Sequence, residues 1–553
     1  MAEKKVETPW HKDDVLEVTI EDMDQDGNGI GHTEDGYTLF IKDAVIGDKV
    51  TAKVMKATPK YAFAKLEEIT ERSPFRVEPK CDISNKCGGC QIQSLDYEHQ
   101  LAFKERKVRG DLIRIGGFPA EKVDEVLYPI IGMDDPFRYR NKEQVPVGMS
   151  TDGVPLTGFY AGRTHSIVPM TDCMLGAEDN KKILEAILEY MKLYHVPAYD
   201  EKTGEGLLRH ILIRNGIYSQ QTMVCLVVNG DSLPEEDKLV EMIRVLPNVT
   251  SISLNVNRAK TNVILGRKLR ILWGEDSILD SLHIFDVKEH RGTDSAGIDV
   301  LVGEKSHPGV SPAGSAKNAT CGNRKMQTFV PTGTQLQFRI SPLSFYQINP
   351  KQTEKMYSLA LDYAALTGKE YVLDLYCGIG TISLFLAKRA KEVYGIEVVP
   401  EAVRDAKINA ERNGISNALF ETGRAEDVLP AFVERRRKEG RRNPVDVVVV
   451  DPPRKGLDDG TINIILKLMP KRVVYVSCDP ATLARDLRKL CEKEYELRKV
   501  TPVDNFCNSV HVETVCLLSN TQKKKSYVTL DVEMKDYHRI VGDRKTSDKP
   551  AGK

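Results

Sequence analysis

From residue 371 onward, short apolar runs alternate with longer amphipathic stretches, and this alternation restricts the fold more than any other feature. The apolar runs include YVLDLYCG, EVYGIEVV, DVVVVDPP and RVVYVSCD, and a segment of helical periodicity follows each of them. Strands that are buried on both faces and joined by helices form a parallel, doubly wound sheet. We therefore predict an α/β, Rossmann-like domain over residues 346–520, with ligands bound at the carboxyl ends of its strands.

The rest of the chain must form further domains, because 553 residues exceed the ~250–300 at which a single core stops growing. Residues 12–72 carry period-2 segments separated by Gly- and Asp-bearing turns, which predict a small antiparallel barrel. Residues 73–345 mix helical and strand-like segments and predict an α+β central domain. Within it, residues 286–334 are rich in Gly, Ser and charge, and we interpret them as an inserted loop. Residues 521–553 form a C-terminal extension.

The sequence also indicates where in the cell the protein is located. The N-terminal segment MAEKKVETPWHKDD lacks the apolar core of a signal peptide, and no apolar run reaches the ~18 residues of a membrane span. We expect a cytoplasmic protein with no membrane contact. In a reducing compartment its 11 cysteines are metal ligands, catalysts or core residues rather than disulfides. The net charge of −1 neither favours nor excludes nucleic acid, since a basic patch can be offset elsewhere.

The first two strand ends indicate a cofactor with an adenosine group. Gly378 and Gly380 follow the first strand, where glycines let the backbone approach a ligand, and Glu397 ends the second strand, where an acid can accept hydrogen bonds from ribose hydroxyls. The alternative interpretation of Glu397 is a solvated acid at a strand end without a ligand. A third glycine that would favour a dinucleotide is missing, so S-adenosylmethionine, which has no pyrophosphate, fits better.

The fourth strand ends in Asp451-Pro452-Pro453, and the two prolines make a rigid exit that holds a carboxylate still. Arg454 and Lys455 follow, so we expect a negative or electron-rich neighbour. A simple turn at a strand end is the alternative interpretation of this motif.

The fifth strand ends at Cys478, just before Asp479 and Pro480, which have the pattern of a helix N-cap and first turn. The dipole of that helix should lower the pKa of the thiol below its free value of ~8.5. A thiolate beside S-adenosylmethionine suggests addition to carbon 6 of a pyrimidine, which activates carbon 5 for methylation. Glu513, at the start of the last predicted strand, could then remove the carbon 5 proton. An inert, buried thiol is the alternative.

Together these segments resemble the RNA uracil-5-methyltransferase family over the whole C-terminal half, in order. The matching stretches are Gln347-Ile-Asn-Pro350, DLYCGIGT, Glu397, DPPRKG, SCDPATLARDL and HVETV, with further likeness at Tyr139–Lys142 and Ile340–Phe345. The resemblance implies a class I methyltransferase domain in which Cys478 is the nucleophile and Glu513 the base. It also implies that four residues line the cofactor and uracil pocket: Gln347, Tyr376, Glu397 and Asp451.

Two parts of the chain add to or depart from this likeness. The N-terminal barrel is similar to a TRAM domain, an OB-like RNA-binding module, so we expect it to hold RNA together with the central domain. The segment VDNFCNSVHVETV departs from the family, which usually has Met-Phe-Pro after the Asp. The departure concerns the shape of the loop that leads to Glu513.

Four cysteines form a separate group: Cys81, Cys87 and Cys90 in CDISNKCGGC, and Cys173 in PMTDCMLG. Their spacing alone favours a structural zinc site, with an iron–sulfur cluster as the second choice. The resemblance reverses that order, because the ribosomal branch of the family carries a [4Fe-4S] cluster on this pattern. The transfer-RNA branch typically lacks both the cluster and the TRAM domain.

We therefore expect a monomeric 23S ribosomal RNA uracil-5-methyltransferase that acts on an unpaired or flipped uridine. Two alternatives stay open: the same chemistry on transfer RNA, and a non-catalytic iron–sulfur RNA-binding protein that has kept the fold.

Overall fold

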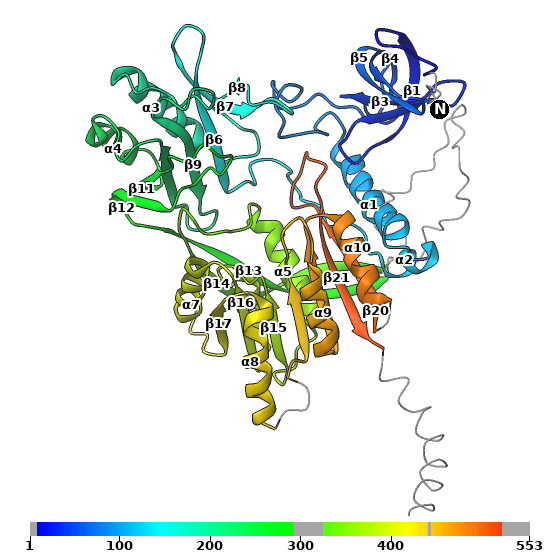
Figure 1. Ribbon diagram of the computed structural model, residues 1–553, viewed down its shortest axis with the longest axis vertical. Helices are drawn as coiled ribbons and strands as arrows, with labels where there is room; N and C mark the ends of the chain where they lie inside the picture. The colour runs from blue at the N-terminus through cyan, green and yellow to red at the C-terminus, as the bar shows by residue number, and fades with distance from the viewer. Residues whose placement is uncertain (1–7, 292–324, 441–443, 493, 522–553) are drawn as a thin grey trace, which may run out of the picture.

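The computed structural model describes residues 8–291, 325–440, 444–492 and 494–521. Figure 1 shows a small barrel and a mixed sheet side by side at one end, with a larger α/β unit beneath both. The predicted C-terminal extension lies outside the described residues except for its first residue.

The N-terminal unit is a closed five-stranded barrel with the strand order β1-β2-β3-β5-β4. Alternate residues of each strand point inward, and Leu39, Ile41 and Val50 are fully buried in its core. The prediction of an antiparallel barrel is wrong for one pair, because β3 and β5 run parallel. The reason is the path of the chain: β4 separates the two in sequence, and β5 returns beside β3 to close the barrel. The strands are β1 (Val15–Met23), β2 (Gly29–His32), β3 (Thr38–Lys42), β4 (Lys49–Ala57) and β5 (Tyr61–Glu71).

The central unit is built on a seven-stranded sheet of order β12-β11-β10-β9-β6-β7-β8, covered by two amphipathic helices. Ile183 and Ile187 of α3 and Leu239 of α4 are completely buried against it. Its elements are β6 (Lys142–Met149), β7 (Pro155–Tyr160), β8 (Ile167–Pro169), α3 (Asn180–Leu193), β9 (Leu208–Asn215), β10 (Thr222–Val228), α4 (Glu236–Arg244), β11 (Val249–Val256) and β12 (Lys268–Gly274).

A two-stranded antiparallel ribbon, β13 (Ile278–Arg291) with β14 (Lys325–Ile340), follows the central sheet. The prediction of a loop over 286–334 is therefore wrong at both ends, where Asp286 pairs with Val330 and Arg291 with Lys325. A two-stranded ribbon buries little surface, so this part of it carries polar residues and shows no apolar face in the sequence. Residues 292–324 lie outside the described part of the chain.

The C-terminal unit has the predicted doubly wound α/β architecture, with the strand order β17-β16-β15-β18-β19-β21-β20. Its pairs are parallel except those made by β21, which runs antiparallel to β19 and β20. The elements are α5 (Pro350–Ala364), β15 (Tyr371–Leu375), α6 (Thr381–Ala387), β16 (Glu392–Glu397), α7 (Pro400–Arg412), β17 (Ala418–Thr422), α8 (Ala425–Lys438), β18 (Val447–Val450), α9 (Asp459–Leu468), β19 (Arg472–Ser477), α10 (Pro480–Cys491), β20 (Tyr495–Val503) and β21 (Glu513–Asn520).

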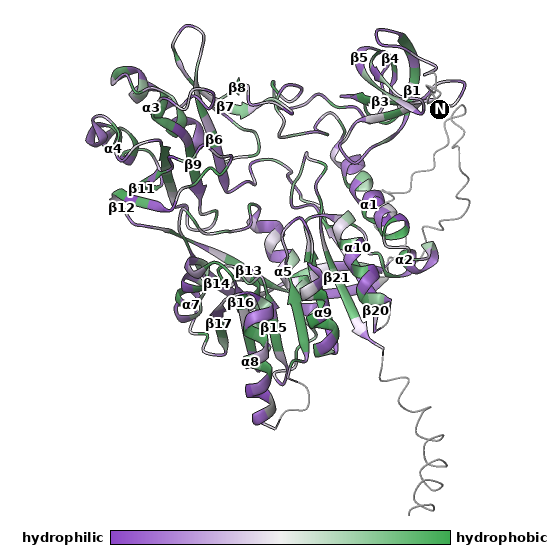
Figure 2. Cartoon of the chain, viewed as in Figure 1, coloured by the Kyte–Doolittle hydropathy of each residue, from purple (hydrophilic) through white to green (hydrophobic). Residues whose placement is uncertain are grey.

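Both faces of this sheet are buried, which explains the continuous apolar runs of its strands (Figure 2). Val447 and Val449 of β18 face the cluster that α5, α6 and α7 cover, and Val448 faces the cluster on the opposite side. That second face is covered by α8, α9 and α10 and also by α1 (Tyr97–Arg114) and α2 (Ala120–Val126), from the segment after the barrel. The segment that precedes the central sheet is therefore part of the support of the C-terminal sheet.

Candidate active site

The predicted site residues gather at one edge of the C-terminal sheet. Tyr376, Glu397, Asp451 and Cys478 lie at the carboxyl ends of β15, β16, β18 and β19, which are parallel. Since such ends meet at the same edge, four residues that are far apart in sequence share one region.

Cys478 and Glu513 are neighbours because of the register between β19 and β21. Ser477 pairs with Thr514 in this antiparallel ladder, and continuing the register by one residue places Cys478 opposite Glu513. Glu513 is only 2% exposed, and its Oε2 has no hydrogen-bond partner among the described residues. Cys478 is partly exposed. An accessible thiol therefore lies beside a buried carboxyl group that has one oxygen free to bind or to accept a proton.

The predicted low pKa of Cys478 is wrong. Burial raises the pKa of this thiol to about 12, and the charges of Glu513 and Asp451 add to the increase, while Arg454 opposes it. The helix that follows does begin as predicted, with the Asp479 side chain accepting a hydrogen bond of 2.9 Å from the Thr482 backbone N–H. Burial and the charges of three carboxylates, Glu513, Asp451 and Asp479, outweigh the dipole of this helix.

The two carboxyl groups also act on each other. Burial raises the pKa of Asp451, and burial together with the charge of Asp451 raises the pKa of Glu513 well above its usual value. Arg454, which is exposed, acts in the opposite direction on Glu513. Asp451, with a pKa of about 7, is thus able to hold a proton near neutral pH, as a general acid–base group must, and Glu513 keeps its proton to a higher pH than an ordinary glutamate.

The first strand end has the geometry of a cofactor cradle. Glu397 accepts hydrogen bonds from the backbone N–H groups of Gly378 (3.2 Å) and Val399 (3.0 Å), so its carboxylate is held over the glycine turn. Gly378 has φ +55°, and a side chain there would meet nothing within 4 Å in the described part of the chain, so the turn is open toward a ligand. An acid fixed beside an open backbone turn fits the ribose end of an adenosine cofactor.

Tyr376 lies next to this cradle, at the end of β15, and Gln347 contacts the loop before Glu513. Tyr376 has φ +69°, a strained conformation for a bulky residue, and its hydroxyl shares a hydrogen bond of 3.1 Å with Thr461. Gln347 is 8% exposed, and its Oε1 accepts a hydrogen bond of 3.4 Å from Asn505, in the loop before Glu513. The structure therefore links Gln347 to the loop of the predicted base.

Two further residues belong to this region although the sequence did not indicate a role for them. Tyr357 of α5 is buried, and burial raises the pKa of its hydroxyl, as do the charges of Asp451 and Glu513, while hydrogen bonds to Thr381 and Gln347 oppose the increase. The Tyr357 hydroxyl therefore lies between Thr381, which follows the glycine turn, and the two carboxyl groups of Asp451 and Glu513. No signal could have identified it, because its position on α5 is also that of a core residue.

Asp374 is the second such residue. It is completely buried in β15, none of the residues that the structure describes makes a hydrogen bond to its Oδ1, and burial raises its pKa to about 7. The charges of Asp451 and Glu397 add to that increase. The DLYCGIGT motif contains it, but the pattern does not reveal that its carboxyl group is buried near two others.

The loop between β20 and β21 is anchored by α1. Lys104 Nζ donates to Asp504 Oδ1 at 2.5 Å and to the Phe506 carbonyl at 3.0 Å, and both Lys104 and Asp504 side chains are fully buried. Tyr97 donates to the other Asp504 oxygen at 2.8 Å. The loop that departs from the family pattern is thus held rigidly on its way to Glu513.

The four candidate thiols converge from two distant segments. The charges of Cys173, Cys87 and Cys81 all contribute to the raised pKa of Cys90, after burial, so each lies close enough to act on it. The Gly89 N–H donates to Cys87 Sγ at 3.4 Å. However, within the part of the chain that the structure describes, no group of three or more His, Cys, Asp or Glu side chains is arranged to hold a metal ion. The donors are brought together but are not in ligand geometry.

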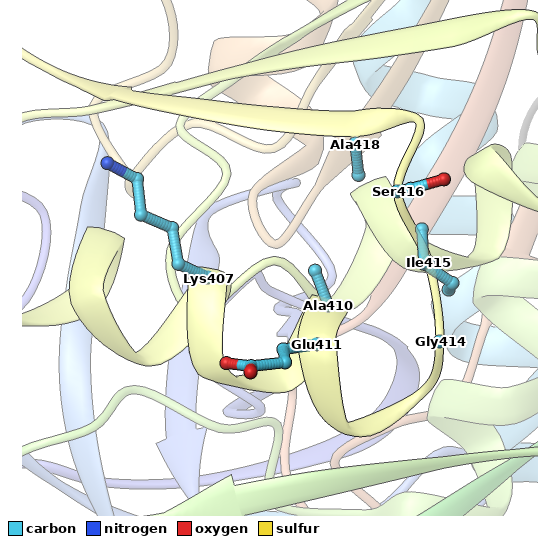
Figure 3. A pocket seen from close by; sticks show the side chains of 7 residues that line it. All are labelled: Lys407, Ala410, Glu411, Gly414, Ile415, Ser416 and Ala418. Carbon is cyan, nitrogen blue, oxygen red and sulfur yellow. The ribbon is translucent and has the colours of Figure 1, made fainter.

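A pocket of about 460 Å³ lies elsewhere, where α7 ends and the chain turns into β17 (Figure 3). Its lining includes Lys407, Glu411 and Ser416. Since it adjoins the amino end of β17, it lies at the edge of the sheet opposite the carboxyl ends. It is therefore separate from the candidate active site.

Comparison with known proteins identifies the family. An RNA methyltransferase of Halalkalibacterium halodurans is 43% identical over 93% of this chain and 99% of its own length, and one of Clostridium tetani is 40% identical over 94% and 100%. The model of the tRNA (uracil-5-)-methyltransferase family matches residues 324–521. The chain belongs to the RNA uracil-5-methyltransferase family.

Two further comparisons agree with the architecture of this methyltransferase. The TRAM domain model matches residues 10–66, which contain the closed barrel. The crystal structure of the Pyrococcus abyssi tRNA (uracil-54, C5)-methyltransferase in complex with S-adenosyl-L-homocysteine has the same fold, with a TM-score of 0.63, 24% identity and coverage of 91% of this chain and 100% of that one. The protein is an RNA-modifying enzyme, and none of the helices in the described ranges is long and apolar enough to cross a membrane.

Proposed function

We propose that this enzyme transfers a methyl group from S-adenosylmethionine to carbon 5 of a specific uridine in 23S ribosomal RNA, through a covalent adduct between Cys478 and the base. It acts in the cytoplasm as a monomer. The observation that carries the proposal is the placement of Cys478 opposite Glu513, beside Asp451, at the carboxyl edge of the sheet. A thiol, a base and a cofactor cradle at one edge suit methylation at a carbon that is not itself nucleophilic.

The residues of this chain have the following roles. As the Cys478 sulfur bonds to carbon 6 of the uracil, the thiol proton passes to Asp451 and the electrons of the C5–C6 bond move onto O4, which forms an enolate. Bound S-adenosylmethionine supplies the methyl group that carbon 5 takes. Glu513 then removes the carbon 5 proton, the C5–C6 double bond re-forms as the sulfur–carbon bond breaks, and Cys478 leaves as a thiolate that takes its proton back from Asp451.

The raised pKa of Cys478 is compatible with this sequence of steps. A thiol that keeps its proton in the free enzyme is protected from oxidation and alkylation. Asp451, whose pKa is raised by burial, is suited to receive the proton. The positive charge of Arg454 favours the thiolate form of Cys478.

Two observations support S-adenosylmethionine as the methyl donor. The solved relative from Pyrococcus abyssi contains S-adenosyl-L-homocysteine, the product left by that donor. In this chain, Glu397 and the open turn at Gly378 provide the ribose site, with Gln347, Tyr376 and Asp451 as further lining.

We also propose that Cys81, Cys87, Cys90 and Cys173 hold a [4Fe-4S] cluster. The donor set is all thiol, and two of its members, Cys90 and Cys173, share one apolar cluster of side chains. Burial raises the pKa of Cys90 and of Cys173 to about 12, so these thiols keep their protons unless a bound cation displaces them. Cluster assembly would have to draw the four sulfurs into ligand distance. Anaerobically purified protein should contain iron and sulfide in about equal amounts, and zinc without sulfide would disprove the assignment.

The combination of this cysteine pattern with the TRAM barrel supports ribosomal RNA as the substrate. The alternative is transfer RNA, which the solved relative covering 91% of this chain methylates according to its name. Mapping 5-methyluridine in both RNAs, with and without this enzyme, decides between them. Loss of the modification from transfer RNA alone would replace the ribosomal assignment.

The covalent mechanism is tested with two substitutions. Glu513→Gln should allow attack and methyl transfer but not proton removal, so the enzyme should accumulate as an adduct with methylated RNA that survives denaturing electrophoresis. Cys478→Ala should bind RNA and cofactor but form neither the adduct nor 5-methyluridine. Cys491→Ser, which changes a thiol at the end of α10, is the matched control and should behave as wild type. Substantial turnover by Cys478→Ala would reject the covalent mechanism.

A further inference from the structure

The loop between β20 and β21 contains a fully buried asparagine, Asn505, that has no role in the chemistry described so far. Its Nδ2 donates to Gln347 Oε1 at 3.4 Å, which is the one hydrogen bond that its side chain makes among the described residues. Its Oδ1 has no partner within the same ranges. A buried acceptor without a partner is unfavourable, and a leucine of similar size would avoid it. Packing alone therefore does not account for an asparagine at this position.

Both peptide groups that flank Asn505 are held in place. Gln352 Nε2 donates to the Asp504 carbonyl at 3.1 Å. The Asn349 side chain donates to the Asn505 carbonyl at 3.4 Å. The side-chain amide of Asn505 is therefore a donor at a fixed place beside Gln347.

Gln347 is also held at its backbone, because the Asn141 side chain donates to the Gln347 carbonyl at 2.9 Å. The other end of the Gln347 side-chain amide faces Tyr357. A hydrogen bond from Gln347 lowers the pKa of the Tyr357 hydroxyl, and such a bond has to be donated to the phenol oxygen. The carbonyl of the Gln347 amide thus points to Asn505, and its NH2 group points to Tyr357.

The NH2 group of Gln347 lies on the side of the reacting groups. The charges of Asp451 and Glu513 both raise the pKa of Tyr357, so both carboxyl groups lie near this tyrosine. An amide NH2 group has two N–H bonds, and Tyr357 takes one of them. The second can be donated to a base bound at the same place. O4 of uracil is an acceptor, whereas the N4 amino group of cytosine is a donor, so an amide turned this way matches uracil.

We propose that Asn505 is a positioning residue, which holds the Gln347 amide so that its NH2 group donates to O4 of the target uracil. O4 becomes an enolate oxygen when Cys478 adds to carbon 6, and a donor fixed at that oxygen stabilises the intermediate. Without Asn505 the amide can turn over and present its carbonyl to the base. The inference rests on the proposed function, because it concerns the uracil that this function methylates.

The first test compares two RNAs: a 23S ribosomal RNA transcript, and the same transcript with 4-thiouridine in place of the uridine found by mapping. Sulfur is a weak hydrogen-bond acceptor, so the replacement weakens the bond to Gln347. Asn505→Leu should lower kcat on the ordinary transcript roughly 10-fold, less than the 10²–10³ that outright loss of an oxyanion donor costs. KM for RNA should stay within about twofold, since the bond matters most in the intermediate.

The two RNAs separate a lost O4 contact from a general loss of activity. Sulfur substitution changes the intrinsic reactivity of the base equally for every enzyme variant, so only the ratio of the two kcat values is compared. That ratio should be roughly tenfold closer to one for Asn505→Leu than for wild type, because the variant has already lost the bond that sulfur weakens.

The second test asks whether Asn505 acts through Gln347. Adding Asn505→Leu to Gln347→Leu should lower kcat no further, because the amide that Asn505 orients is already gone. Asn505→Met, which introduces the residue that the family usually has after Asp504, should behave as Asn505→Leu and provides a second variant compatible with the loop. Calorimetric affinity for S-adenosyl-L-homocysteine near the wild-type value shows that each variant is folded.

Gln352→Met is the matched control. It removes the donor to the Asp504 carbonyl and so loosens the same loop, but it leaves the bond between Asn505 and Gln347 in place. It should lower the melting temperature while keeping the wild-type ratio of kcat between the two RNAs. A Gln352→Met enzyme with the kinetics of Asn505→Leu would overturn the inference, because rigidity of the loop would then explain both.

The failure of this inference differs from failure of the proposed function. The inference is overturned, and the methyltransferase stands, if both Asn505 variants keep the wild-type kcat or the wild-type ratio between the two RNAs. It is also overturned if the losses from Asn505→Leu and Gln347→Leu multiply. If the wild-type enzyme forms no 5-methyluridine in any RNA, the proposed function fails and this inference fails with it.

Discussion

The reactivity of Cys478 tests the electrostatics of the active site directly. With a pKa of about 12, only about 10⁻⁴ of the thiol is ionised at pH 8, against about a quarter for an ordinary thiol of pKa ~8.5. A more basic thiolate is also more nucleophilic, by about 40-fold for this difference. The two effects leave a net reactivity roughly 60-fold below that of an ordinary thiol at the same exposure.

The assay is alkylation by iodoacetamide between pH 7 and 10, followed by mass spectrometry of the peptide that contains Cys478. We expect the rate to rise about tenfold per pH unit with no plateau below pH 10, because the thiolate fraction grows throughout that range. A plateau is more informative than the absolute rate, since steric access affects the rate but not its midpoint.

Replacing one carboxylate by an amide separates the two causes of the raised pKa of Cys478, namely the charge of that carboxylate and burial of the thiol. Asp451→Asn should move the alkylation curve to lower pH, because the charge of Asp451 raises the pKa of Cys478. Glu397→Gln, at the same edge of the sheet, is the matched control and should leave the curve in place, since the charge of Glu397 acts on Asp374 and Cys377. If the alkylation rate of the wild-type enzyme reaches a plateau with a midpoint at or below pH 8.5, the reasoning is refuted. If the Asp451→Asn curve has the same midpoint as wild type, the charge of Asp451 does not contribute to the raised pKa of Cys478.

Four further outcomes are expected. Lys104→Met should lower the free energy of unfolding by about 3–5 kcal/mol in urea denaturation, because Asp504 is left buried without its cation; a loss under 1 kcal/mol would contradict this. Tyr357→Phe should lower kcat about tenfold without changing RNA affinity, since only the hydroxyl that bridges the carboxyl pair and the cofactor side is lost; unchanged kcat would make Tyr357 a core residue. Cys90→Ser should reduce iron and sulfide content and weaken RNA binding more than cofactor binding, and full iron content would exclude it as a ligand. Deleting residues 1–72 should weaken RNA binding and flatten its salt dependence while cofactor affinity, measured calorimetrically, stays near wild type; equal RNA affinity would assign the barrel to another partner.

The sequence alone predicted the strands and helices that are buried on one face or on both faces, because their burial leaves an apolar pattern in the sequence. The runs around Asp374, Asp451 and Cys478 predicted a parallel sheet because a strand buried on both faces has to be apolar throughout. The N-cap at Asp479 was also predictable, since a cap depends on contacts within four residues. The ribbon of β13 and β14 was missed because a two-stranded element buries too little to leave an apolar face in its sequence.

The tertiary structure alone decided the state of the groups in the site. The pKa of Cys478 depends on Glu513 and Asp451, which lie 35 and 27 positions away along the chain and become neighbours only when β21 pairs with β19 and β18 ends beside them. The position of Tyr357 likewise requires α5 to pack on one face of the sheet. Hydrophobic patterns in the sequence predict which residues are buried. The protonation of a group depends instead on charges that are distant in sequence and that folding brings to within a few ångströms of it.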